Sequence, residues 1–588
     1  MNRLSFYCRA LVLAMSLCGP VQAASTYYVS TSGSDGATGT AAAPFKTIGR
    51  GISACQTGDT VVVGDGVYSG AGNTHLTISS TITLQSVDGP TRTTIDCTGA
   101  NGALTITAGS TLSPVAVSGF SFQHNPGSLS AVTLTGATAS ITNCTFVRNT
   151  SGVNGGAITT DASSSLTVTG SEFSLNRGVD GGAIDGSGNV TCQSCRFVDN
   201  QAIQGAAMFT TSPTKLTNCT FEGNQAGGDG GAVMSFNGLT VDSSTFTNNT
   251  AEGALGGALC LVTGDSAIVR STISNNHATY GAGIDISAAM STALIQNCIL
   301  TGNVAGDSGG AFYVDQGLSG TASIFGSTIR GNTAVNNGGG ITVKTQVGVN
   351  VKLRDDIFWD DGAELDDASG AVDVMSCDVA SLFTLSNLSI DPLFTDAAAG
   401  DYSLQATSPC LHAGTGVTGM TTDFAGRSRS GTKPTIGAFE GGPGSNWKFV
   451  ANVAGADGIQ RYLWSGMSGA SNDIALWRIV PPAANAQSSK EYGPFPGWKP
   501  LFIGIGPNLH ERILFFNANT AKFWLWDVSP NYSYTTLTIG PSTGYIPTSM
   551  TVSSDNHVHM VCVNSSGAAY DFDIAPAGTV TSKAYGPY

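Results

Sequence analysis

The sequence predicts an all-β protein that consists of a parallel β-helix, which is a solenoid of stacked coils, followed by a small antiparallel domain. Three observations predict this. An apolar-x-x-Asn phrase recurs every 24 to 29 residues, a glycine-rich phrase follows it from the second copy to the ninth, and six of the seven Trp residues lie in residues 446–588. Self-similarity at such a period is typical of solenoids and other repeat architectures.

Residues 1–23 have the pattern of a secretory signal peptide. Arg3 and Arg9 form a basic region, residues 10–17 are apolar, and a small-x-small cleavage pattern ends at Ala23. The apolar stretch is too short for a membrane span, and no later apolar run reaches the ~20 residues of a membrane helix. We therefore expect an exported protein that is secreted or held at the cell surface.

The composition is acidic, poor in charge and rich in glycine. The formal net charge is −15, only 11% of residues are charged, and Gly numbers 77. An acidic chain is a poor partner for nucleic acid or for anionic membranes, which attract basic patches. The negative net charge also disfavours binding of polyanionic glycans, unless a cation bridges the protein and the glycan. Many Gly, Thr, Ser and Asn residues suit short strands and tight turns.

The repeated phrase predicts how each coil is built. Each apolar anchor should stack on its counterpart one coil away, ~4.8 Å distant, and each Asn should sit at a bend and bond the backbone or the next Asn. The glycine pairs permit corners that a Cβ would block. The copies are Phe122/Asn125, Phe146/Asn149, Phe173/Asn176, Phe197/Asn200, Phe221/Asn224, Phe246/Asn249, Ile273/Asn276, Leu300/Asn303, Ile329/Asn332 and a degenerate Ile357/Asp360.

Eleven cysteines follow the signal segment, and four of them occupy one position of the repeat. Cys144, Cys195, Cys219 and Cys298 each come two residues before an anchor, which predicts an interior column of small residues. Cys192 and Cys195 are three apart, so on one strand they should face opposite sides. We therefore expect packing thiols rather than a metal site.

The solenoid is predicted to have a cap at each end. Phe45, Ile48 and Ile52 have helical spacing after a Pro, so a short helix should cap the first coil. We divide the chain into residues 24–100 for this cap and the first coils, 101–375 for the repeated coils, 376–440 for the C-terminal cap, 441–446 for a Gly- and Pro-containing linker, and 447–588 for the second domain.

The Gly-Gly-Ala and Phe-x-x-Asn phrases resemble the repeats of the chlamydial polymorphic outer-membrane protein family. That resemblance implies a right-handed parallel β-helix at a cell surface, often serving adhesion. One departure is that those proteins end in a membrane β-barrel, and this chain does not. The opening is similar to that of many extracellular β-helix proteins, and residues 391–440 resemble the closing segment of bacterial surface proteins of the choice-of-anchor kind.

Residues 447–588 contain three copies of a unit of about 48 residues. Four-strand units of 40 to 50 residues are typical of propeller blades. The matching segments of the copies are 461–464, 512–515 and 558–561, and then 476–479, 525–528 and 571–574. The units resemble tectonin-like and fucose-lectin-like propeller repeats. Because propellers have four to eight blades, we expect either two chains that combine into a homo-oligomer or an open arrangement.

The lectin resemblance implies carbohydrate binding between blades, on an aromatic platform with Arg and acidic side chains at the sugar hydroxyls. Packing of sugar C–H faces on rings agrees with the physics of such a site. The alternative for each Trp is a place in the core. The candidate residues are Trp464, Trp477, Trp498, Trp524, Trp526, Arg461, Arg478, Arg512, Glu491 and Glu511.

Catalytic and metal sites have weaker signals. Asp180 and Asp229 both precede a glycine pair, two coils apart, at a separation on the order of 10 Å, which is near the upper limit for an inverting glycosidase pair. The densest carboxylate run includes Asp355, Asp356, Asp360 and Asp361, which could bind calcium but lack the spacing of a calcium loop.

These patterns favour a non-catalytic, adhesin-like surface or secreted protein in which a rigid β-helix presents a carbohydrate-binding module. Its partners would be glycans or other surface molecules of a host or neighbouring cell. The alternative is an extracellular polysaccharide lyase or glycoside hydrolase with catalysis on the solenoid. A purely structural surface component is the third possibility.

Overall fold

The computed structural model describes residues 23–440 and 447–585 with internal gaps. The predicted signal segment up to residue 22 and the predicted linker at 441–446 lie outside the described residues. The gaps are residues 287–291, 315–319, 345–349, 368–369, 371, 381, 383–385, 406, 432, 455–459, 467–473, 480–486, 493–494, 496–497, 518, 541–543, 554 and 565–568.

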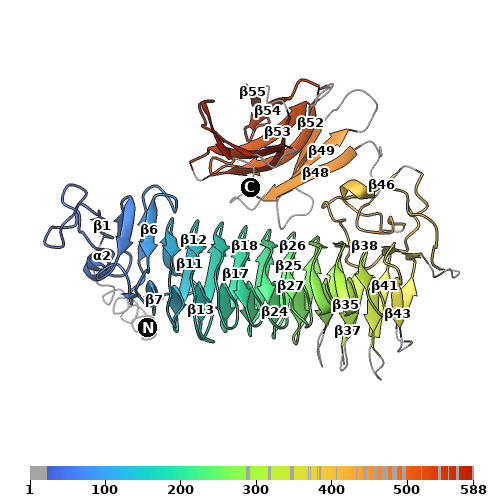
Figure 1. Cartoon of the computed structure of the whole chain (residues 1–588), viewed down its shortest axis with the longest axis horizontal. Helices are drawn as coiled ribbons and strands as arrows, with labels where there is room; N and C mark the ends of the chain where they lie inside the picture. Colours follow the sequence, from blue (N-terminus) through green and yellow to red (C-terminus); the bar gives the residue numbers. More distant parts are fainter. Residues whose placement is uncertain are drawn as a thin grey trace, which may run out of the picture.

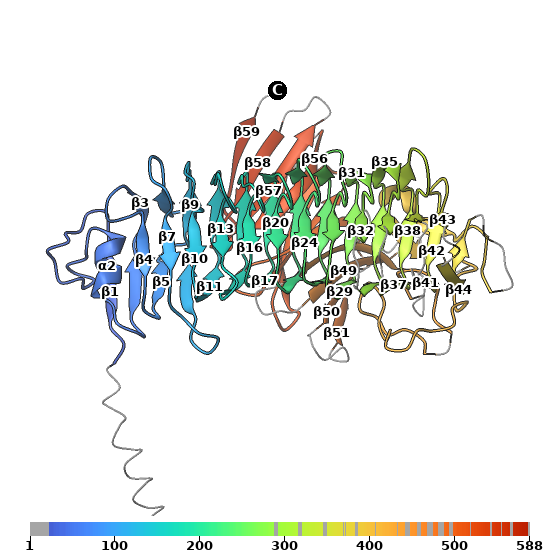
Figure 2. The ribbon, with the colours of Figure 1, turned by 90° about the horizontal axis from the view of Figure 1, so that it is seen from below.

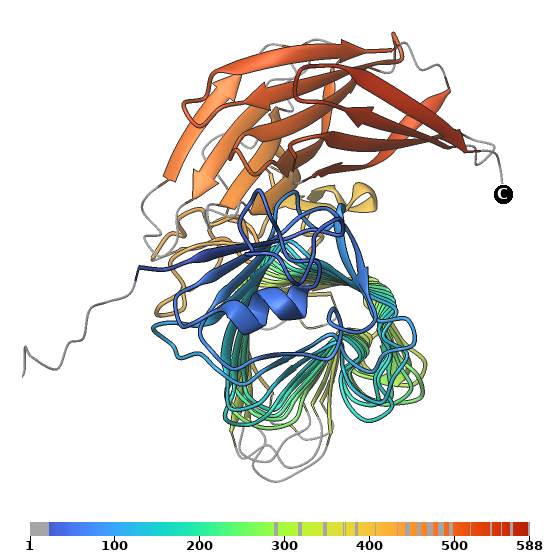
Figure 3. The same ribbon diagram turned by 90° about the vertical axis from the view of Figure 1, so that its left-hand side faces the viewer.

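Residues 26–379 form the predicted parallel β-helix, which is right-handed. Each complete coil contributes one strand to each of three long parallel sheets. We call them sheets 1, 2 and 3, in the order in which the chain passes through them within a coil. The stack of coils runs along the long axis of the molecule in Figure 1, and Figure 3 shows it from its N-terminal end.

Sheet 1 has 14 strands: β1 (Thr26–Val29), β2 (Thr60–Val63), β5 (Thr83–Ser86), β8 (Val115–Ser118), β11 (Thr138–Thr142), β14 (Ser165–Thr169), β17 (Asn189–Gln193), β21 (Thr214–Thr217), β25 (Leu239–Asp242), β29 (Ser266–Val269), β33 (Ala293–Gln296), β37 (Thr321–Phe325), β41 (Asn350–Arg354) and β44 (Val372–Met375). Sheet 2 has 13 strands: β3 (Gly66–Ser69), β6 (Thr93–Asp96), β9 (Ser121–Gln123), β12 (Thr145–Val147), β15 (Glu172–Ser174), β18 (Arg196–Val198), β22 (Thr220–Glu222), β26 (Thr245–Thr247), β30 (Thr272–Ser274), β34 (Ile299–Thr301), β38 (Thr328–Arg330), β42 (Ile357–Trp359) and β45 (Asp378–Val379).

Sheet 3 has 12 strands: β4 (Leu76–Ile78), β7 (Leu104–Ile106), β10 (Val132–Leu134), β13 (Ile158–Thr160), β16 (Ile184–Gly186), β20 (Met208–Thr210), β24 (Val233–Ser235), β28 (Leu259–Leu261), β32 (Ile284–Ile286), β36 (Phe312–Val314), β40 (Ile341–Val343) and β43 (Leu365–Asp367). Between sheets 2 and 3 the later coils add a fourth sheet of six short strands: β19 (Gln201–Ala202), β23 (Gln225–Ala226), β27 (Thr250–Ala251), β31 (His277–Tyr280), β35 (Val304–Ser308) and β39 (Thr333–Ala334).

The predicted stacking of like residues is confirmed. Phe146 pairs in register with Phe122 and Phe173, and the ring centroids of these neighbours lie 4.8 Å apart. The parallel rings continue through Phe197 and Phe221 at similar spacing. Alternation is confirmed too, since Leu166 and Val168 on β14 are buried and Thr167 between them is exposed.

The Asn residues form a continuous buried ladder along the corner after sheet 2. In each interior rung the side-chain Nδ2 of the Asn donates to the backbone carbonyl of the anchor residue one coil before. The same Nδ2 and the backbone N–H of that Asn both donate to Oδ1 of the Asn one coil after. Asn200, for example, donates from Nδ2 to Phe173 O and to Asn224 Oδ1, both at 3.0 Å. This pattern satisfies buried polar groups that the corner would otherwise leave without partners.

The last rung corrects the predicted register. Phe358 pairs with Ile329, and Asp361 accepts hydrogen bonds from Asn332, so the last copy is Phe358/Asp361 and the prediction of Ile357/Asp360 was wrong. Phe358 follows Ile329 by the same 29 residues that separate Ile329 from Leu300. The sequence is ambiguous by one residue here because both Ile357/Asp360 and Phe358/Asp361 read apolar-x-x-Asp.

The glycine pairs form the predicted tight corners. Gly230 has φ 70°, in the left-handed region that favours glycine. A Cβ on Gly231 would lie 1.9 Å from the carbonyl oxygen of Gly257 on the next coil, so a side chain there would displace the backbone.

The interior column of small residues is confirmed, because Cys144, Cys195, Cys219 and Cys298 are all buried. The prediction that Cys192 and Cys195 face opposite sides was wrong, since both are buried in the same core. The reason is the bend between β17 and β18, where Ser194 has φ 54° and turns the chain so that both thiols point inward.

The predicted N-terminal capping helix is present as α2 (Ile48–Ala54). Thr47 caps it by accepting a hydrogen bond from the Arg50 N–H, and Ile48 and Gly51 face the first coil. After β45 the chain does not simply close the far end of the stack. The 3-10 helix η1 (Ala397–Ala399) and the hairpin β46 (Phe394–Asp396) and β47 (Asp401–Leu404) belong to a segment that runs back along the outside of several coils. Arg429 holds this segment by donating to Asn297 Oδ1 and to Gly326 O.

Residues 447–585 form three antiparallel sheets of four consecutive strands, which we call sheets 5, 6 and 7. The first strand of each pairs with the second through the same register shift, which confirms that the three units are repeats. The strands are β48 (Trp447–Ala454), β49 (Gln460–Gly466), β50 (Ile474–Ile479) and β51 (Gln487–Tyr492) in sheet 5; β52 (Lys499–Ile505), β53 (Glu511–Asn517), β54 (Lys522–Val528) and β55 (Tyr534–Ile539) in sheet 6; and β56 (Tyr545–Val552), β57 (Val558–Asn564), β58 (Ala569–Ile574) and β59 (Val580–Tyr585) in sheet 7.

The first strands bring the three sheets together, since β48 packs against β52 and β52 against β56. The three sheets lie beside the solenoid in all three views (Figures 1, 2 and 3). Within the described ranges, no helix combines the length and the apolar character needed to cross a membrane.

Candidate functional site

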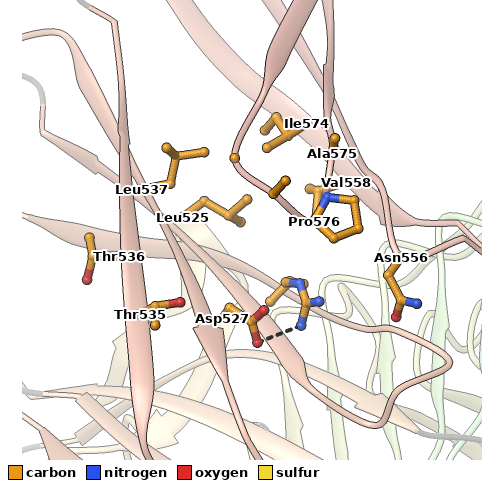
Figure 4. Close-up of a pocket in the computed structure, with 13 residues that line it drawn as sticks. Leu525, Asp527, Thr535, Thr536, Leu537, Asn556, Val558, Ile574, Ala575 and Pro576 are labelled. Atoms are coloured by element: carbon orange, nitrogen blue, oxygen red, sulfur yellow. Dashed lines mark hydrogen bonds and ion pairs between the residues drawn. The ribbon is translucent and has the colours of Figure 1, made fainter.

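A pocket of about 240 Å³ opens between sheets 6 and 7 (Figure 4). Its polar side is formed by Arg512, Asp527 and the hydroxyl side chain of Thr535, which lies directly opposite Asp527 on the neighbouring strand. Its apolar side comes from both sheets and from the turn after β58, and consists of Leu525, Leu537, Val558, Ile574 and Pro576. Asn556 lies at the edge, just before β57.

The strand register places the charged pair of the pocket. Arg512 on β53 lies directly opposite Asp527 on β54, and its Nη1 donates to Asp527 Oδ1 at 2.9 Å. His510 Nδ1 lies 2.5 Å from the same carboxylate oxygen. The Asp527 side chain is one third exposed, whereas that of Arg512 is only 4% exposed. The carboxylate therefore lies at the mouth and the guanidinium lies deeper.

Burial is the main influence on the Arg512 guanidinium. It lowers the pKa of Arg512 below its usual value, and the charges of Asp527 and Glu511 partly offset this effect. Arginine nevertheless stays charged in proteins. A buried cation of this kind is tolerated when it has a partner of opposite charge and hydrogen-bond acceptors for its donors. Asp527 supplies the first requirement.

The corresponding place between sheets 5 and 6 is closed by a buried ion cluster. Glu511 Oε1 accepts from Arg461 Nε and from Arg478 Nε, each at 2.7 Å, and its Oε2 accepts from Arg478 Nη2 at 2.5 Å. All three side chains are buried. The Arg478 guanidinium also lies 3.9 Å from the centre of the Tyr532 ring. Three residues proposed from the sequence are thus brought together, and they bond one another rather than line the pocket.

Repeat symmetry explains why one interface is closed and the other open. The cross-strand pairs Arg461/Arg478 and Arg512/Asp527 occupy equivalent positions in sheets 5 and 6. In sheet 7 the equivalent pair is His559/Asp573, so the sequence alignment of segment 558–561 with segment 512–515 was out of register by one residue. Val558 therefore matches Glu511, and a small apolar side chain replaces the carboxylate that fills the first interface.

The aromatic candidates divide into core and partly exposed positions. Trp526 is buried and stacks on Tyr534, as the core alternative predicted. Trp498 and Trp524 are half-buried and stack on each other, with ring centroids 3.7 Å apart. The side chains of Trp464, Trp477 and Glu491 lie outside what the structure describes.

Sequence reasoning found one residue of the pocket, Arg512, and missed the others. Asp527 and Thr535 carry no motif, and Asn556 and Val558 lie in loops or at strand ends. The only signal in the sequence is positional. Once the three units are aligned on their cross-strand pairs, Val558 is the residue at which the second interface departs from the first.

The solenoid carboxylates proposed as a catalytic pair lie in one column, two coils apart. Gln204 lies on the coil between them and forms a β-bridge with Asp180. The backbone N–H of the following residue, Gly205, donates to the carbonyl of Asp229. Asp229 Oδ1 accepts from the Leu255 N–H at 3.0 Å and so stabilises a turn.

Sequence reasoning missed Asp185, an outward residue of β16. Burial, with the nearby charge of Asp180, raises the pKa of Asp185 to about 7.

The four carboxylates proposed for calcium serve four separate contacts. Asp355 accepts from the Thr415 and Gly416 N–H groups, and Asp356 from those of Ser327 and Arg354. Asp360 pairs with Arg330 at 2.6 Å, and Asp361 ends the Asn ladder. Within the described ranges no group of three or more His, Cys, Asp or Glu side chains is arranged to hold a metal ion.

Two family models match parts of the chain. The right-handed β-helix region matches residues 91–246, and a protein family of unknown function matches residues 31–85. No curated protein matches the sequence significantly.

Distant likenesses exist among solved structures. The pectate lyase Pel9A is 15% identical with a TM-score of 0.36, over 71% of this chain and 96% of the lyase. A rhamnogalacturonan lyase is 12% identical with a TM-score of 0.25, over 63% and 90% of the two chains. The receptor-binding domain of the siphovirus 9NA tailspike is 9% identical with a TM-score of 0.20, over 84% and 96%.

Proposed function

We propose that this chain is an exported, adhesin-like carbohydrate-binding protein, in which the β-helix carries a C-terminal module that binds one sugar residue between sheets 6 and 7. The observation that supports this most is the Arg512 guanidinium. A guanidinium has five N–H donors. Among the described residues, that of Arg512 makes a single hydrogen bond, to Asp527, although its side chain is buried beside a cavity.

Donors and acceptors at the pocket match the edge of a sugar ring. Each sugar hydroxyl both donates and accepts, so Arg512 can donate to it while Asp527 accepts from it, and these charge-assisted bonds are the strong ones. Thr535 adds a hydroxyl group on the same side. Leu525, Leu537 and Pro576 offer apolar contact for the C–H face of the ring.

The size of the pocket supports a small ligand. A volume of about 240 Å³ lies below the roughly 300–1,000 Å³ of pockets for drug-sized ligands. One pyranose ring is of this order, whereas an oligosaccharide would have to extend out of the mouth past Asp527. Weak binding of single residues suits adhesion when many copies act together, because linked sites gain avidity without new contacts.

The solenoid supports this function as a rigid carrier. Its coils share one continuous core and satisfy one another's backbone groups along the whole stack. The predicted signal segment supports export, and secretion or display at a cell surface remains part of the proposal. A second copy of the chain that extends the three sheets into a larger ring is compatible with this proposal and can be checked by measuring the mass in solution.

A glycan array with the chain from residue 24 onward, followed by calorimetric titration of the best ligands, tests the proposal. R512K keeps the charge but loses the planar fork, so it should weaken binding at least about tenfold. T535V removes a pocket hydroxyl. T536V, the neighbouring residue on the opposite face of the same strand, is its matched control and should bind normally. Unchanged affinity in both R512K and T535V would refute the site.

One observation favours the alternative of a polysaccharide-cleaving enzyme. Asp185 and Asp180 lie on the same part of the solenoid, and a carboxyl group with a pKa of about 7 can act as a general acid near neutral pH. Reducing-sugar and unsaturated-uronate assays on a polysaccharide panel test this alternative. Turnover that is lost in D185N but kept in D229N would favour hydrolysis on the solenoid over adhesion.

A further inference from the structure

Two arginines on neighbouring coils of the solenoid, Arg148 and Arg177, differ from the other arginines of the β-helix part. Their guanidinium groups make no hydrogen bond or ion pair with the described residues, and both side chains are exposed. Seven others each pair with a carboxylate: Arg92, Arg196, Arg270, Arg330, Arg354, Arg427 and Arg429. Two unneutralised cations side by side are unusual on a chain of net charge −15.

The coil register brings the two arginines to one shallow pocket of about 200 Å³. Thr150, Arg177 and Gln201 form one column of bridged residues on three successive coils. Arg148, Leu175 and Asp199 form the neighbouring column, each two residues after its Phe anchor. Successive coils are ~4.8 Å apart, so the six side chains form a patch the size of one or two sugar rings.

The second column lies at a strained corner. Arg148 and Leu175 have φ values of 53° and 57°, in the left-handed region that bulky side chains avoid. At the same corner other coils have Gly223, Asn248 and Gly302, which tolerate this backbone. Arg148 and Leu175, the bulky residues with a strained backbone at this corner, therefore both line the pocket. Backbone strain of this kind concentrates at functional positions.

The remaining groups fit a ring that bears one acidic substituent. Leu175 is 44% exposed in the centre of the patch, where it can pack on the C–H face of a sugar. Gln201 and Thr150 can bond hydroxyl groups. Asp199 adds one negative charge, but its Oδ1 leans over Gly223 on the following coil, on the side away from Arg148. The arginines therefore dominate the charge at the Arg148 end.

We propose that this patch is a second glycan-binding site, which binds an acidic sugar residue through a carboxylate or sulfate group held between Arg148 and Arg177, with Leu175 under the ring. The site is separate from the C-terminal pocket and stands whether or not that pocket binds sugar. It also qualifies the expectation drawn from net charge, because a local pair of unpaired arginines attracts an anionic group that the chain as a whole repels.

Titration of the chain from residue 24 onward with four probes tests the proposal: trigalacturonate, galactotriose, a sulfated galactose trisaccharide and inorganic sulfate. We expect trigalacturonate or the sulfated trisaccharide to bind, with affinity that falls as salt rises because exposed charges are screened. R148Q and R177Q should each weaken that binding by about tenfold or more. R196Q is the matched control, because Arg196 is exposed on the next coil but pairs with Glu222 at 2.8 Å.

Each other outcome overturns the proposal. These outcomes are equally tight binding of galactotriose that R148Q and R177Q weaken to the same extent, binding of inorganic sulfate as tight as that of the acidic trisaccharides, an equal effect of R196Q, or no binding of either acidic trisaccharide. The R512K variant should leave this binding unchanged, so failure here and failure of the C-terminal pocket can be told apart.

A second pair of variants separates binding from folding. R148N and L175N place at the corner the residue that Asn248 and Asn275 provide in later coils. Because Asn tolerates the left-handed backbone, both variants should melt at or above the wild-type temperature while they lose binding. Lower melting temperatures with unchanged binding would show that the two residues serve the fold and not a ligand.

Discussion

Glu511 and Val558 occupy the same position in consecutive sheets of the C-terminal domain, and each pairs with the last residue of the strand that follows. Glu511 is buried and joins two arginines of the preceding sheet, whereas Val558 leaves a pocket beside the single Arg512. Two differences between the repeats, Val558 for Glu511 and Asp527 for Arg478, thus replace a filled ion cluster by a cavity beside a guanidinium that makes one hydrogen bond.

We predict that V558E closes this pocket. The introduced carboxylate should pair with Arg512 as Glu511 pairs with Arg461, so sugar binding should fall at least about tenfold while the domain stays folded. V558T, which has nearly the same volume and no charge, should keep most of the affinity. Calorimetric titration together with thermal unfolding measures both effects, and normal binding by a folded V558E would contradict the assignment of the pocket.

A second prediction concerns the end of the Asn ladder. Burial raises the pKa of Asp361 to about 8, aided by the charges of Glu364 and Asp360 and opposed by the hydrogen bonds from Asn332. The native state therefore holds a proton that the unfolded chain, with a pKa near 3.8, releases, so stability falls as pH rises from about 4 to 8.

D361N should remove that loss of stability. Its amide can donate to Ile329 O, as the Asn332 amide donates to Leu300 O, and stability near pH 8 should rise by about 1–3 kcal/mol. Denaturant unfolding at several pH values measures this. D360N is the control, because Asp360 is exposed and paired with Arg330. A loss of stability in D361N would mean that the carboxyl group itself is needed at the last rung.

A third prediction tests the interior of the ladder. N224A should destabilise the solenoid by about 2–4 kcal/mol, because it removes the donor to Phe197 O and leaves the Asn200 amide without its Oδ1 partner. T240A, an exposed change on β25 of the following coil, should have almost no effect. Equal stability of the two variants would contradict the role of the ladder.

A fourth prediction concerns pH and the third sheet. Asp573 lies 2.6 Å from His557 Nδ1, and this hydrogen bond raises the pKa of His557 above its usual value. The pair therefore contributes stability below pH ~6.5, and that contribution is lost as pH rises through the raised pKa of His557. Because both side chains are partly exposed, the effect should stay under about 1 kcal/mol.

An NMR titration of the histidine ring protons measures that pKa directly. D573N should lower the pKa of His557 toward its ordinary value, because it removes the main group that raises it. A normal pKa of His557 in the wild-type chain would show that the contact with Asp573 is absent in solution.

The sequence by itself determined the coils and their columns. Phe146 stacks on Phe173 and Asn149 bonds Asn176 because residues one coil apart are neighbours by translation, so a repeat in the sequence is directly a contact in space. The same logic predicted the small-residue column at Cys195 and the three units after residue 446. It failed where the register could be read in two ways or where the chain bends, at Asp361, in the alignment of residues 558–561, and between Cys192 and Cys195.

Only the tertiary structure decided the sites. Whether Glu511 fills one interface and Val558 opens the next depends on how separate sheets pack, and no periodicity in the sequence specifies that packing. Likewise, Arg148 and Arg177 read as two scattered charges until the register of neighbouring coils places both in one patch with Leu175. Both proposed sites lie at departures from the repeat, and the surroundings of a departure depend on the side chains that three-dimensional packing brings next to it.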